Sequence, residues 1–515
     1  MRTGPSWRQA LSSATAILIY IALLKLLVHL LAVGQYGYHR DELYYLAASQ
    51  HLDFGYVDFP PFIAALTALI RATLGDSLFA LHLVPALAGA AVVVIAGLMA
   101  RQLGGGKWAQ AAAALAVAVA PTFLGINSLL TMDTFDELFW VLALYIVIVI
   151  LKHDRPRLWL LFGFIVGLGL LTKVTILYLV AALLIGLLLT RHRRYLLNKW
   201  LWLGGALALV MFSPYIYWQI AHGWPTLEFW RTYAAGKTYP VTPVEFLVQQ
   251  VTMLNPLTLP LWIGGLVFLF SSAGKTFRPL GWTYAILYVV LTVQQAKFYF
   301  LAPTYPLLFA AGAVWWSGVL RQRRYRRPAV AVYLALLTAL GLVTAPLALP
   351  LLPVETIARY VNPAAIAQQE RLEIGVLPQH FADRFGWPEL AATVADVYHA
   401  LPAAEQAHVC IVGDNYGEAG AIDLFGPALG LPKAISEHNS YYVWGPGDCS
   451  GETVIIIEGR DTSPADMQAV FSDVELAART ACTYCMPYEN NRPIYIGRGL
   501  KTGIADAWRA GKTYE

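Results

Sequence analysis

Charged side chains stand beside aromatics in one short stretch that borders a long apolar run, and this stretch is the first candidate for chemistry. It reads His39-Arg40-Asp41-Glu42-Leu43-Tyr44-Tyr45, follows an apolar run that ends near Val33, and precedes the pair Pro60-Pro61. Charges at a membrane surface are costly unless they are paired, hydrated or used. A carboxylate there can act as a general base toward a hydroxyl, and an arginine can hold a phosphate. An ordinary interfacial loop with an Arg40–Asp41 ion pair remains the alternative.

More carboxylates occur near the starts of later apolar runs. Asp58 lies in the stretch HLDFGYVDFPPF, and the stretch NSLLTMDTFDELFW holds Asp133, Asp136 and Glu137. Three carboxylates that enter hydrocarbon without a local cation are expensive. Asp133 and Glu137 would share one helix face, and Asp133 could cap the helix N-terminus. Capping accounts for one of the three acids and leaves the others available for chemistry.

Isolated cations accompany these acids. Lys297 is followed closely by Tyr299 in the stretch QQAKFYFLAPTYP, and Lys173 stands alone between two apolar runs. Each lysine could extend its amine to the membrane interface or could hold a phosphate. Lys25 and His29, one helical turn apart, are expected to face other helices rather than a ligand. Acids and cations together predict a substrate with a phosphate and a reacting hydroxyl, and a lipid-phosphate sugar donor meets both needs.

The composition shows which elements must position these residues. The chain has 515 residues, of which 58% are hydrophobic and 13% are charged, whereas soluble proteins carry about 25% charged residues. Many apolar runs approach the length that crosses a bilayer, so the sequence predicts a polytopic α-helical membrane protein. The net charge of +4 is too small to indicate nucleic-acid binding. We expect eleven spans, near 10–33, 78–100, 108–124, 134–151, 158–172, 174–190, 200–220, 256–271, 281–293, 304–320 and 329–350.

Basic residues predict the orientation of these spans. One set of loops carries most of the cations, including the run from Arg321 to Arg327, whereas the other set holds only a few, among them Arg40, Lys173 and Lys297. The cation-rich loops of a membrane protein face the cytoplasm. The N-terminus is therefore expected in the cytoplasm, with the first run as an uncleaved anchor. Asp41 and everything after residue 350 would then face outward.

The C-terminal part differs in composition from the rest. We expect two domains, a transmembrane domain over 1–350 and a small extracytoplasmic α/β domain over 351–515. Short apolar pieces alternate with turn residues in the second domain. The pattern predicts helices over 388–400, 417–429 and 465–471, and strands over 408–413 and 453–458.

All four cysteines lie in this second domain. Cys410 falls in a predicted strand and is expected to be a buried thiol, while Cys449 is expected to bond to Cys482 or Cys485. Cys482 and Cys485 have the spacing of half a zinc site, but no second ligand pair with zinc spacing exists in the sequence. A metal site is therefore not expected.

At this point the sequence resembles the GT-C glycosyltransferases, specifically bacterial relatives of the protein O-mannosyltransferases and of the aminoarabinose transferases that modify lipid A. The matching pieces are HRDELYYLA, DFPPF, TMDTFDELFW and AKFYFLAPTYPLL, which spread over residues 36–310. The C-terminal part also resembles the periplasmic domain of a subgroup of these proteins, through GDNYGEAGAIDLFG and ISEHNSYYVWGP.

The resemblance implies an activity and assigns roles to residues. It implies an inverting transfer of a sugar from a polyprenyl-phosphate donor to a hydroxyl of a lipid, glycan or protein acceptor, without metal or cofactor, on the outer face of a bacterial inner membrane. Asp41 matches the presumed general base, beside Glu42 and Asp136. Lys297 matches a lysine that lies near the donor phosphate, and Arg40, Lys173 and Tyr299 are the other candidates for phosphate binding, from their charge and position. Asp58, Asp133, Glu137 and Tyr45 are the further candidates, for the acceptor or for support of the site.

Two other functions remain open. The chain could be a proton-coupled secondary transporter, although such proteins usually hold ionisable groups near the midplane and show repeated halves. It could also be a non-catalytic membrane scaffold whose outer domain binds a partner. The glycines of GDNYGEAGAI could cradle a nucleotide, but we expect that they allow close packing of a helix and a strand. No Gly-rich phosphate loop occurs in a cytoplasmic segment, which argues against an ATP-driven pump.

Overall fold

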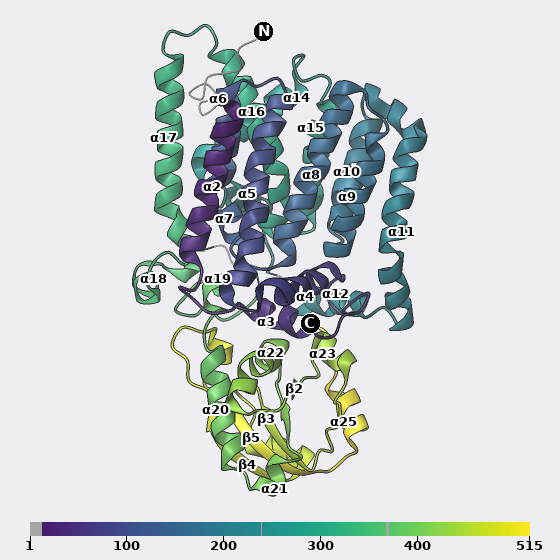
Figure 1. Ribbon diagram of the computed structural model, residues 1–515, viewed down its shortest axis with the longest axis vertical. Coiled ribbons are helices and arrows are strands. Elements are labelled where there is room, and N and C mark those ends of the chain that lie inside the picture. The colour runs from purple at the N-terminus through teal and green to yellow at the C-terminus, as the bar shows by residue number, and fades with distance from the viewer. Residues whose placement is uncertain (1–12, 238, 367–369) are drawn as a thin grey trace. The chain divides into compact units, whose positions relative to one another are not determined.

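The computed structural model describes residues 13–237, 239–366 and 370–515. The chain forms two compact units, each made of segments that are distant in the sequence (Figure 1). The first, here called the helical unit, comprises Met1–Val33, Leu81–Pro214 and Pro240–Leu351. The second, here called the mixed unit, comprises Gly34–Ala80, Tyr215–Tyr239 and Leu352–Glu515. The C-terminal residues thus share a unit with two segments from the N-terminal half of the chain.

Apolar α-helices build the helical unit. Its helices, two of which extend into segments of the mixed unit, are α2 (Ala14–Ala32), α5 (Leu78–Gln102), α6 (Lys107–Ala118), α7 (Pro121–Ile126), α8 (Met132–His153), α9 (Leu158–Thr172), α10 (Ile176–Leu188), α11 (Lys199–Ala221), α13 (Pro243–Thr252), α14 (Leu259–Phe270), α15 (Arg278–Val293), α16 (Tyr305–Val319) and α17 (Arg326–Thr344). Short 3-10 helices, including η3 (Phe298–Thr304), interrupt the series. Small residues allow close helix contacts, since a Cβ atom on Gly163 of α9 would collide with the backbone of Gly204 on α11.

Several of these helices are long and apolar enough to cross a membrane. Six of the described helical segments qualify alone, and two bent pairs raise the number to eight if each pair counts as one span. The protein is therefore a multi-span membrane protein, with fewer such segments than the eleven expected. The difference arises because some apolar runs form short helices. α6 has 12 residues, α9 has 15 and α15 has 16, whereas a perpendicular span needs about 20.

A mixed five-stranded sheet forms the centre of the mixed unit. The strand order is β2-β1-β3-β5-β4, in which β1 (Cys410–Val412) runs parallel to β2 (Ala434–Ile435) and to β3 (Thr453–Ile457). β5 (Pro493–Leu500) runs antiparallel to both β3 and β4 (Phe471–Arg479). The expected strands near 408–413 and 453–458 are confirmed, and so are helices at 388–400, 417–429 and 465–471, as α20 (Trp387–Ala400), α22 (Tyr416–Phe425) and α24 (Pro464–Val470).

The segment that holds Asp41 packs against this C-terminal α/β structure. It forms α3 (Arg40–Ala48), and α22 lies against it. A Cβ atom on Gly420 would lie 2.9 Å from the backbone carbon of Leu43, and one on Gly417 would meet Arg40 Cγ at 2.5 Å. Only glycine fits at such distances, so these glycines allow close packing, as expected. Their partner is the helix α3 rather than a strand.

A disulfide joins Cys410 to Cys449 and corrects both cysteine expectations. Their Cα atoms are 5.6 Å apart, within the usual range for a disulfide. Cys410 lies on β1, and Cys449 lies in the segment that leads into the neighbouring strand β3, so the parallel pairing of the two strands brings them together. Cys449 therefore does not bond to Cys482 or Cys485, which remain free thiols.

Candidate functional site

Asp41 lies at the N-terminus of α3, and the capping of this helix explains the acidic pair. His39 is the N-cap residue, and Glu42 Oε2 accepts a hydrogen bond from the His39 backbone N–H at 2.9 Å. This reciprocal capping box turns the Glu42 side chain inward, where it is fully buried. The Asp41 side chain stays 35% exposed. Of the two neighbouring acids, Asp41 is therefore the one that a substrate can reach.

A tyrosine from the C-terminal region holds the Asp41 carboxylate. The Tyr416 hydroxyl donates a hydrogen bond to Asp41 Oδ1 at 2.9 Å. The Tyr416 ring stacks on Tyr44 with 4.5 Å between ring centroids and on His438 with 5.0 Å. Its position is fixed further because the Tyr416 backbone N–H donates to His438 Nδ1 at 3.2 Å. One oxygen of Asp41 thus has a fixed donor, which orients the carboxylate.

Arg40 lies in a buried polar cluster. Its Nη1 donates to the Tyr488 hydroxyl at 2.7 Å, and its guanidinium carbon lies 5.1 Å from the centre of the Tyr416 ring. Burial raises the pKa of the nearby Asp383 carboxyl, and the charge of Arg40 partly offsets that rise. Arg40 Nε is buried without a hydrogen-bond partner among the described residues. A buried cationic donor without a partner is rare and suits an anionic ligand.

Asp58 joins the same cluster through Tyr44. The Tyr44 hydroxyl donates to Asp58 Oδ1 at 2.9 Å and accepts a hydrogen bond from the Ser440 backbone N–H at 2.9 Å. Burial raises the pKa of Asp58 to about 7, although the hydrogen bond from Tyr44 acts in the opposite direction. Tyr45, by contrast, is 3% exposed and packs edge-on against Phe59 in the core. Tyr45 therefore has a packing role in this structure.

A second polar cluster lies in the helical unit, at the start of α8. Lys173 Nζ lies 2.6 Å from Asp133 Oδ1, and both side chains are partly exposed. The same ammonium group lies 4.5 Å from the centre of the Phe300 ring and 5.7 Å from that of Tyr299. η3 carries both aromatics, and Lys297 precedes them as its N-cap residue. Asp133, Lys173 and Tyr299 are therefore neighbours, with Lys297 two residues from Tyr299 in the chain.

The other two acids of α8 have buried partners. Asp136 Oδ1 accepts a hydrogen bond from Trp140 Nε1 at 3.0 Å, and Asp136 Oδ2 accepts one from the Thr175 hydroxyl at 2.7 Å. Glu137 Oε2 accepts a hydrogen bond at 3.0 Å from Asn127 Nδ2. These contacts give Asp136 and Glu137 structural partners on neighbouring segments, while Asp133 is the more accessible acid of the three.

Glu137 belongs to a buried chain of polar contacts that starts at Lys25. Lys25 Nζ donates to Asn127 Oδ1 at 2.6 Å, and the amide of Asn127 in turn contacts Glu137. His29 lies within reach of the backbone oxygens of Lys25 and Leu124. Lys25 and His29 thus face other helices, as expected. Asn127 thus bridges Lys25 and Glu137, and this contact offsets the cost of burying these two ionisable groups.

The structure brings the predicted residues together in two sets. The mixed unit holds Arg40, Asp41, Glu42, Tyr45 and Asp58, and the helical unit holds Asp133, Asp136, Glu137, Lys173, Lys297 and Tyr299. Sequence reasoning missed three residues that contact Arg40 or Asp41, namely Tyr416, Tyr488 and Asp383. Tyr416 lies inside the motif GDNYGEAGAI, so this motif could have indicated that Tyr416 belongs to the site. No sequence motif indicated Tyr488 or Asp383.

The described residues contain no group of three or more His, Cys, Asp or Glu side chains placed to hold a metal ion. Cys482 and Cys485 lie close together, since the Cys485 backbone N–H donates to Cys482 Sγ at 3.1 Å. This hydrogen bonding with Cys485 lowers the pKa of the Cys482 thiol to about 7.

Comparison with known proteins extends these observations. Residues 58–218 match the family described as dolichyl-phosphate-mannose-protein mannosyltransferase. Among curated proteins, no sequence matches the chain. Its fold is similar to that of ArnT from Cupriavidus metallidurans bound to undecaprenyl phosphate, with a TM-score of 0.63, 15% identity, and coverage of 94% of this chain and 98% of that chain.

Two further structures share this fold. For ArnT of the same organism in the apo state the TM-score is 0.60 with 16% identity, over 93% of this chain and 97% of that chain. The archaeal oligosaccharyltransferase AglB from Archaeoglobus fulgidus, in complex with an inhibitory peptide and a dolichol-phosphate, gives a TM-score of 0.50 with 12% identity, over 88% of this chain and 70% of that chain. At these identities the likeness establishes the fold.

Proposed function

We propose that this chain is a membrane glycosyltransferase that uses a lipid-phosphate-linked sugar and transfers it by a single inverting displacement to an acceptor hydroxyl. Support comes from the match of residues 58–218 to the dolichyl-phosphate-mannose-protein mannosyltransferase family and from the similarity of the fold to that of ArnT. The donor is a polyprenyl-phosphate sugar. Support for this donor class comes from the similar folds of ArnT and AglB, which were determined with undecaprenyl phosphate and dolichol-phosphate respectively. The acceptor is a lipid, glycan or protein hydroxyl on the extracytoplasmic side.

In this reaction Asp41 is the general base. Its carboxylate accepts the proton of the acceptor hydroxyl while that oxygen forms a bond to the anomeric carbon, and the bond from this carbon to the phosphate oxygen breaks. The exposure of Asp41 and its fixed hydrogen bond from Tyr416 support the role. Glu42 supports the site by capping α3. Asp58 is proposed to contribute through its hydrogen bond with Tyr44.

Cations stabilise the departing phosphate in this proposal. Lys173 and Lys297 of the helical unit, with Tyr299 beside Lys173, supply positive charge for the donor, and Arg40 supplies a further cation in the mixed unit. Fixed cations aimed at a leaving oxygen stabilise the charge that develops there. Asp133 holds the Lys173 ammonium, while Asp136 and Glu137 fix the start of α8. No metal enters this mechanism, and transfer in a strong chelator tests that point.

One observation carries the proposal more than any other. Asp41 is a partly exposed carboxylate at a helix N-terminus, whereas its neighbour Glu42 is fully buried. A substrate can contact the Asp41 carboxylate, whereas the buried Glu42 side chain can only stabilise α3. A proton-coupled transporter would instead need acids along a path through the helical unit. The buried acids Asp136 and Glu137 are held by Trp140, Thr175 and Asn127.

The Asp41→Asn variant tests the proposal. We expect it to fold normally and to transfer sugar from a polyprenyl-phosphate donor 10²–10⁴-fold more slowly, the usual contribution of a positioned base. The matched control is Asp396→Asn, the same chemical change at an exposed position of α20. Transfer is measured with a radiolabelled donor and purified protein. Wild-type transfer by Asp41→Asn would contradict the base assignment, and uptake of donor into vesicles without transfer would favour the transporter.

A further inference from the structure

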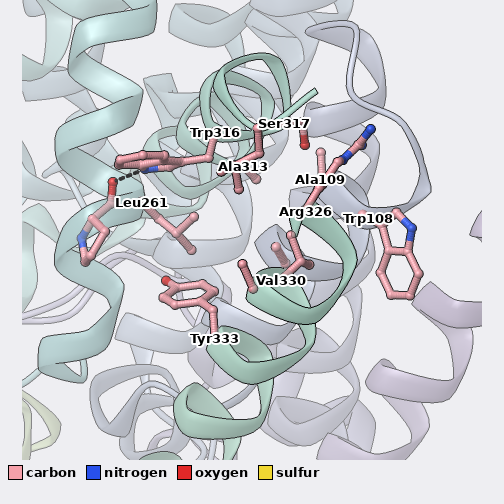
Figure 2. A pocket seen from close by; sticks show the side chains of 13 residues that line it. Trp108, Ala109, Leu261, Ala313, Trp316, Ser317, Arg326, Val330 and Tyr333 are labelled. Carbon is pink, nitrogen blue, oxygen red and sulfur yellow. Dashed lines mark hydrogen bonds between the residues drawn. The ribbon is translucent and has the colours of Figure 1, made fainter. Parts of the chain in front are cut away.

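A cavity between four helices of the helical unit lies apart from the residues discussed so far. Its volume is about 250 Å³, and it is bounded by α6, α14, α16 and α17. Figure 2 shows Trp316 and Leu261 on one side of it and Val330 and Tyr333 on another. An apolar cavity of about 150 Å³ already admits benzene. This cavity therefore has room for a segment of a hydrocarbon chain.

The attachment of α17 explains why the cavity exists. Near its C-terminal end this helix packs closely, since a Cβ atom on Gly341 would collide with Val119 and the Leu337 carbonyl accepts a hydrogen bond from Asn255 Nδ2 at 3.3 Å. Tyr333 is held in the same way, since its hydroxyl donates to the Leu257 carbonyl at 2.8 Å. Before Tyr333, α17 contributes Arg326, Ala329 and Val330 to the cavity wall instead.

One end of the cavity carries positive charge. Arg326 and Trp108 lie at the same end of the cavity, with Ser317 nearby (Figure 2). Lys107 Nζ lies 5.7 Å from the centre of the Trp108 ring. Arg326 also belongs to a run of five arginines, at positions 321, 323, 324, 326 and 327. An apolar cavity with a cationic end and an exposed tryptophan resembles a lipid site at a membrane interface.

Acidic residues are absent from the surrounding sequence. Between Glu245 and Glu355 the chain has no Asp or Glu but eight Lys and Arg residues, and between Asp76 and Asp133 it also has no acid. These two stretches contain all four helices that bound the cavity. Among the described residues, the arginines at 321–327 form no ion pair with an acid. Their charge is therefore left for an anion from outside the protein.

We propose that this cavity binds one acyl chain of an anionic phospholipid, whose headgroup phosphate contacts Arg326 and Lys107. The chain segment lies among Ala109, Ala112, Leu261 and Val330, and the phosphate accepts hydrogen bonds from the cations at the end near Trp108. The lipid fills the space that α17 leaves open and neutralises part of the charge of the arginine run. This proposal does not depend on the transfer reaction or on Asp41.

Native mass spectrometry of the purified, delipidated full chain tests the site. Phosphatidylglycerol is compared with phosphatidylcholine that carries the same acyl chains. We expect one phosphatidylglycerol per chain, bound more tightly than phosphatidylcholine. Arg326→Gln should weaken phosphatidylglycerol binding about fivefold, which corresponds to one interfacial cation, and should leave phosphatidylcholine binding unchanged. Arg321→Gln, in the exposed run but outside the cavity wall, is the matched control.

Ala329→Trp tests the cavity itself, because a tryptophan there would fill the space that the acyl chain needs. We expect this variant to lose the bound phosphatidylglycerol, with a thermal unfolding midpoint that reports whether it folds. If it does not fold, Arg326→Gln and its control still decide the question. Equal effects of Arg321→Gln and Arg326→Gln, equal binding of the two lipids, or one-for-one displacement by undecaprenyl phosphate would each overturn the proposal.

Discussion

At the scale of single residues, the surroundings of Asp41 separate its role from that of Glu42. Glu42 is buried and caps α3, while Asp41 is partly exposed and accepts a hydrogen bond from Tyr416. Tyr416 is itself fixed by stacking on the rings of Tyr44 and His438. A carboxylate held by a rigid donor keeps one oxygen oriented toward an incoming hydroxyl. The positioning of the proposed base therefore depends on a residue from the C-terminal region.

Replacing Tyr416 by Phe removes this hydrogen bond and keeps the ring. A hydrogen bond to a charged group is worth roughly 1.5–3 kcal/mol, so we expect kcat to fall about 10- to 100-fold with little change in KM. Tyr442→Phe, a tyrosine of the same unit stacked on Trp508, is the control. If Tyr416 acts through Asp41, the change should have no further effect in the Asp41→Asn variant, and an additive loss would contradict that role.

Asp58 should make stability depend on pH. Burial raises its pKa to about 7 from the ordinary 3.8, so between these values the folded chain keeps a proton that the unfolded chain has lost. The bound proton adds at most about 4 kcal/mol to the free energy of unfolding. This stabilisation is complete below pH 3.8 and is lost as the pH rises through 7. The Asp58→Asn variant cannot titrate at this position. Its thermal unfolding midpoint, measured relative to that of the wild type, should therefore increase from pH 5 to pH 8. A difference that is constant with pH would contradict this assignment.

At the scale of elements, the contact between α3 and α22 positions Asp41, the proposed base. Gly417 and Gly420 on α22 allow the two helices to approach until the backbone of Leu43 lies within van der Waals distance of α22. Tyr416 begins α22, and Asp41 lies in the first turn of α3. The spacing between the helices therefore controls the hydrogen bond between Tyr416 and Asp41.

Gly420→Ala should disturb this spacing. Its new Cβ atom would lie 2.9 Å from Leu43 C and 3.0 Å from Leu43 Cβ, so the helices must separate, at a cost of about 1–3 kcal/mol typical of overpacking. We expect a lower thermal midpoint and slower transfer together. Gly205→Ala on α11 is the control, because its Cβ atom would meet nothing within 4 Å, and it should be neutral or slightly stabilising. Equal behaviour of the two variants would argue against the packing role.

At the scale of the whole molecule, each compact unit gathers distant segments. The mixed unit joins Gly34–Ala80 to Leu352–Glu515, and contacts such as that between Tyr36 and Leu352 link the two. Both segments must then lie on one side of the membrane. The arrangement of basic loops predicts that this is the outer side.

Cysteine labelling in intact cells checks this arrangement. In a Cys482→Ser, Cys485→Ser background, Leu52→Cys and Asp396→Cys place exposed thiols on the two segments of the mixed unit. A membrane-impermeant maleimide should label both without lysis, whereas Arg324→Cys should react only after lysis. Labelling of one position without the other would contradict the shared unit. Labelling of neither before lysis would reverse the predicted orientation.

The sequence alone predicted the features that depend on local pattern. Apolar runs between cation-rich loops indicated a multi-span membrane protein, and short apolar pieces separated by turn residues indicated α20, α22 and β3. Fewer of the described helices than the eleven expected spans are long enough to cross a bilayer on their own, because some apolar runs form shorter helices. The strands β2, β4 and β5 were not predicted from the sequence. β2 has only two residues, and β4 is largely exposed and holds few buried apolar side chains.

Only the tertiary structure shows which residues distant in the sequence are in contact. Tyr416 and Asp41 are 375 positions apart, and the Cys410–Cys449 bond follows from the parallel pairing of β1 with β3. The sequence determined that acids, cations and aromatics of the right kinds were present near membrane surfaces. It did not determine that Glu42 is buried while Asp41 is exposed, because burial depends on the packing of segments that local patterns cannot relate to one another.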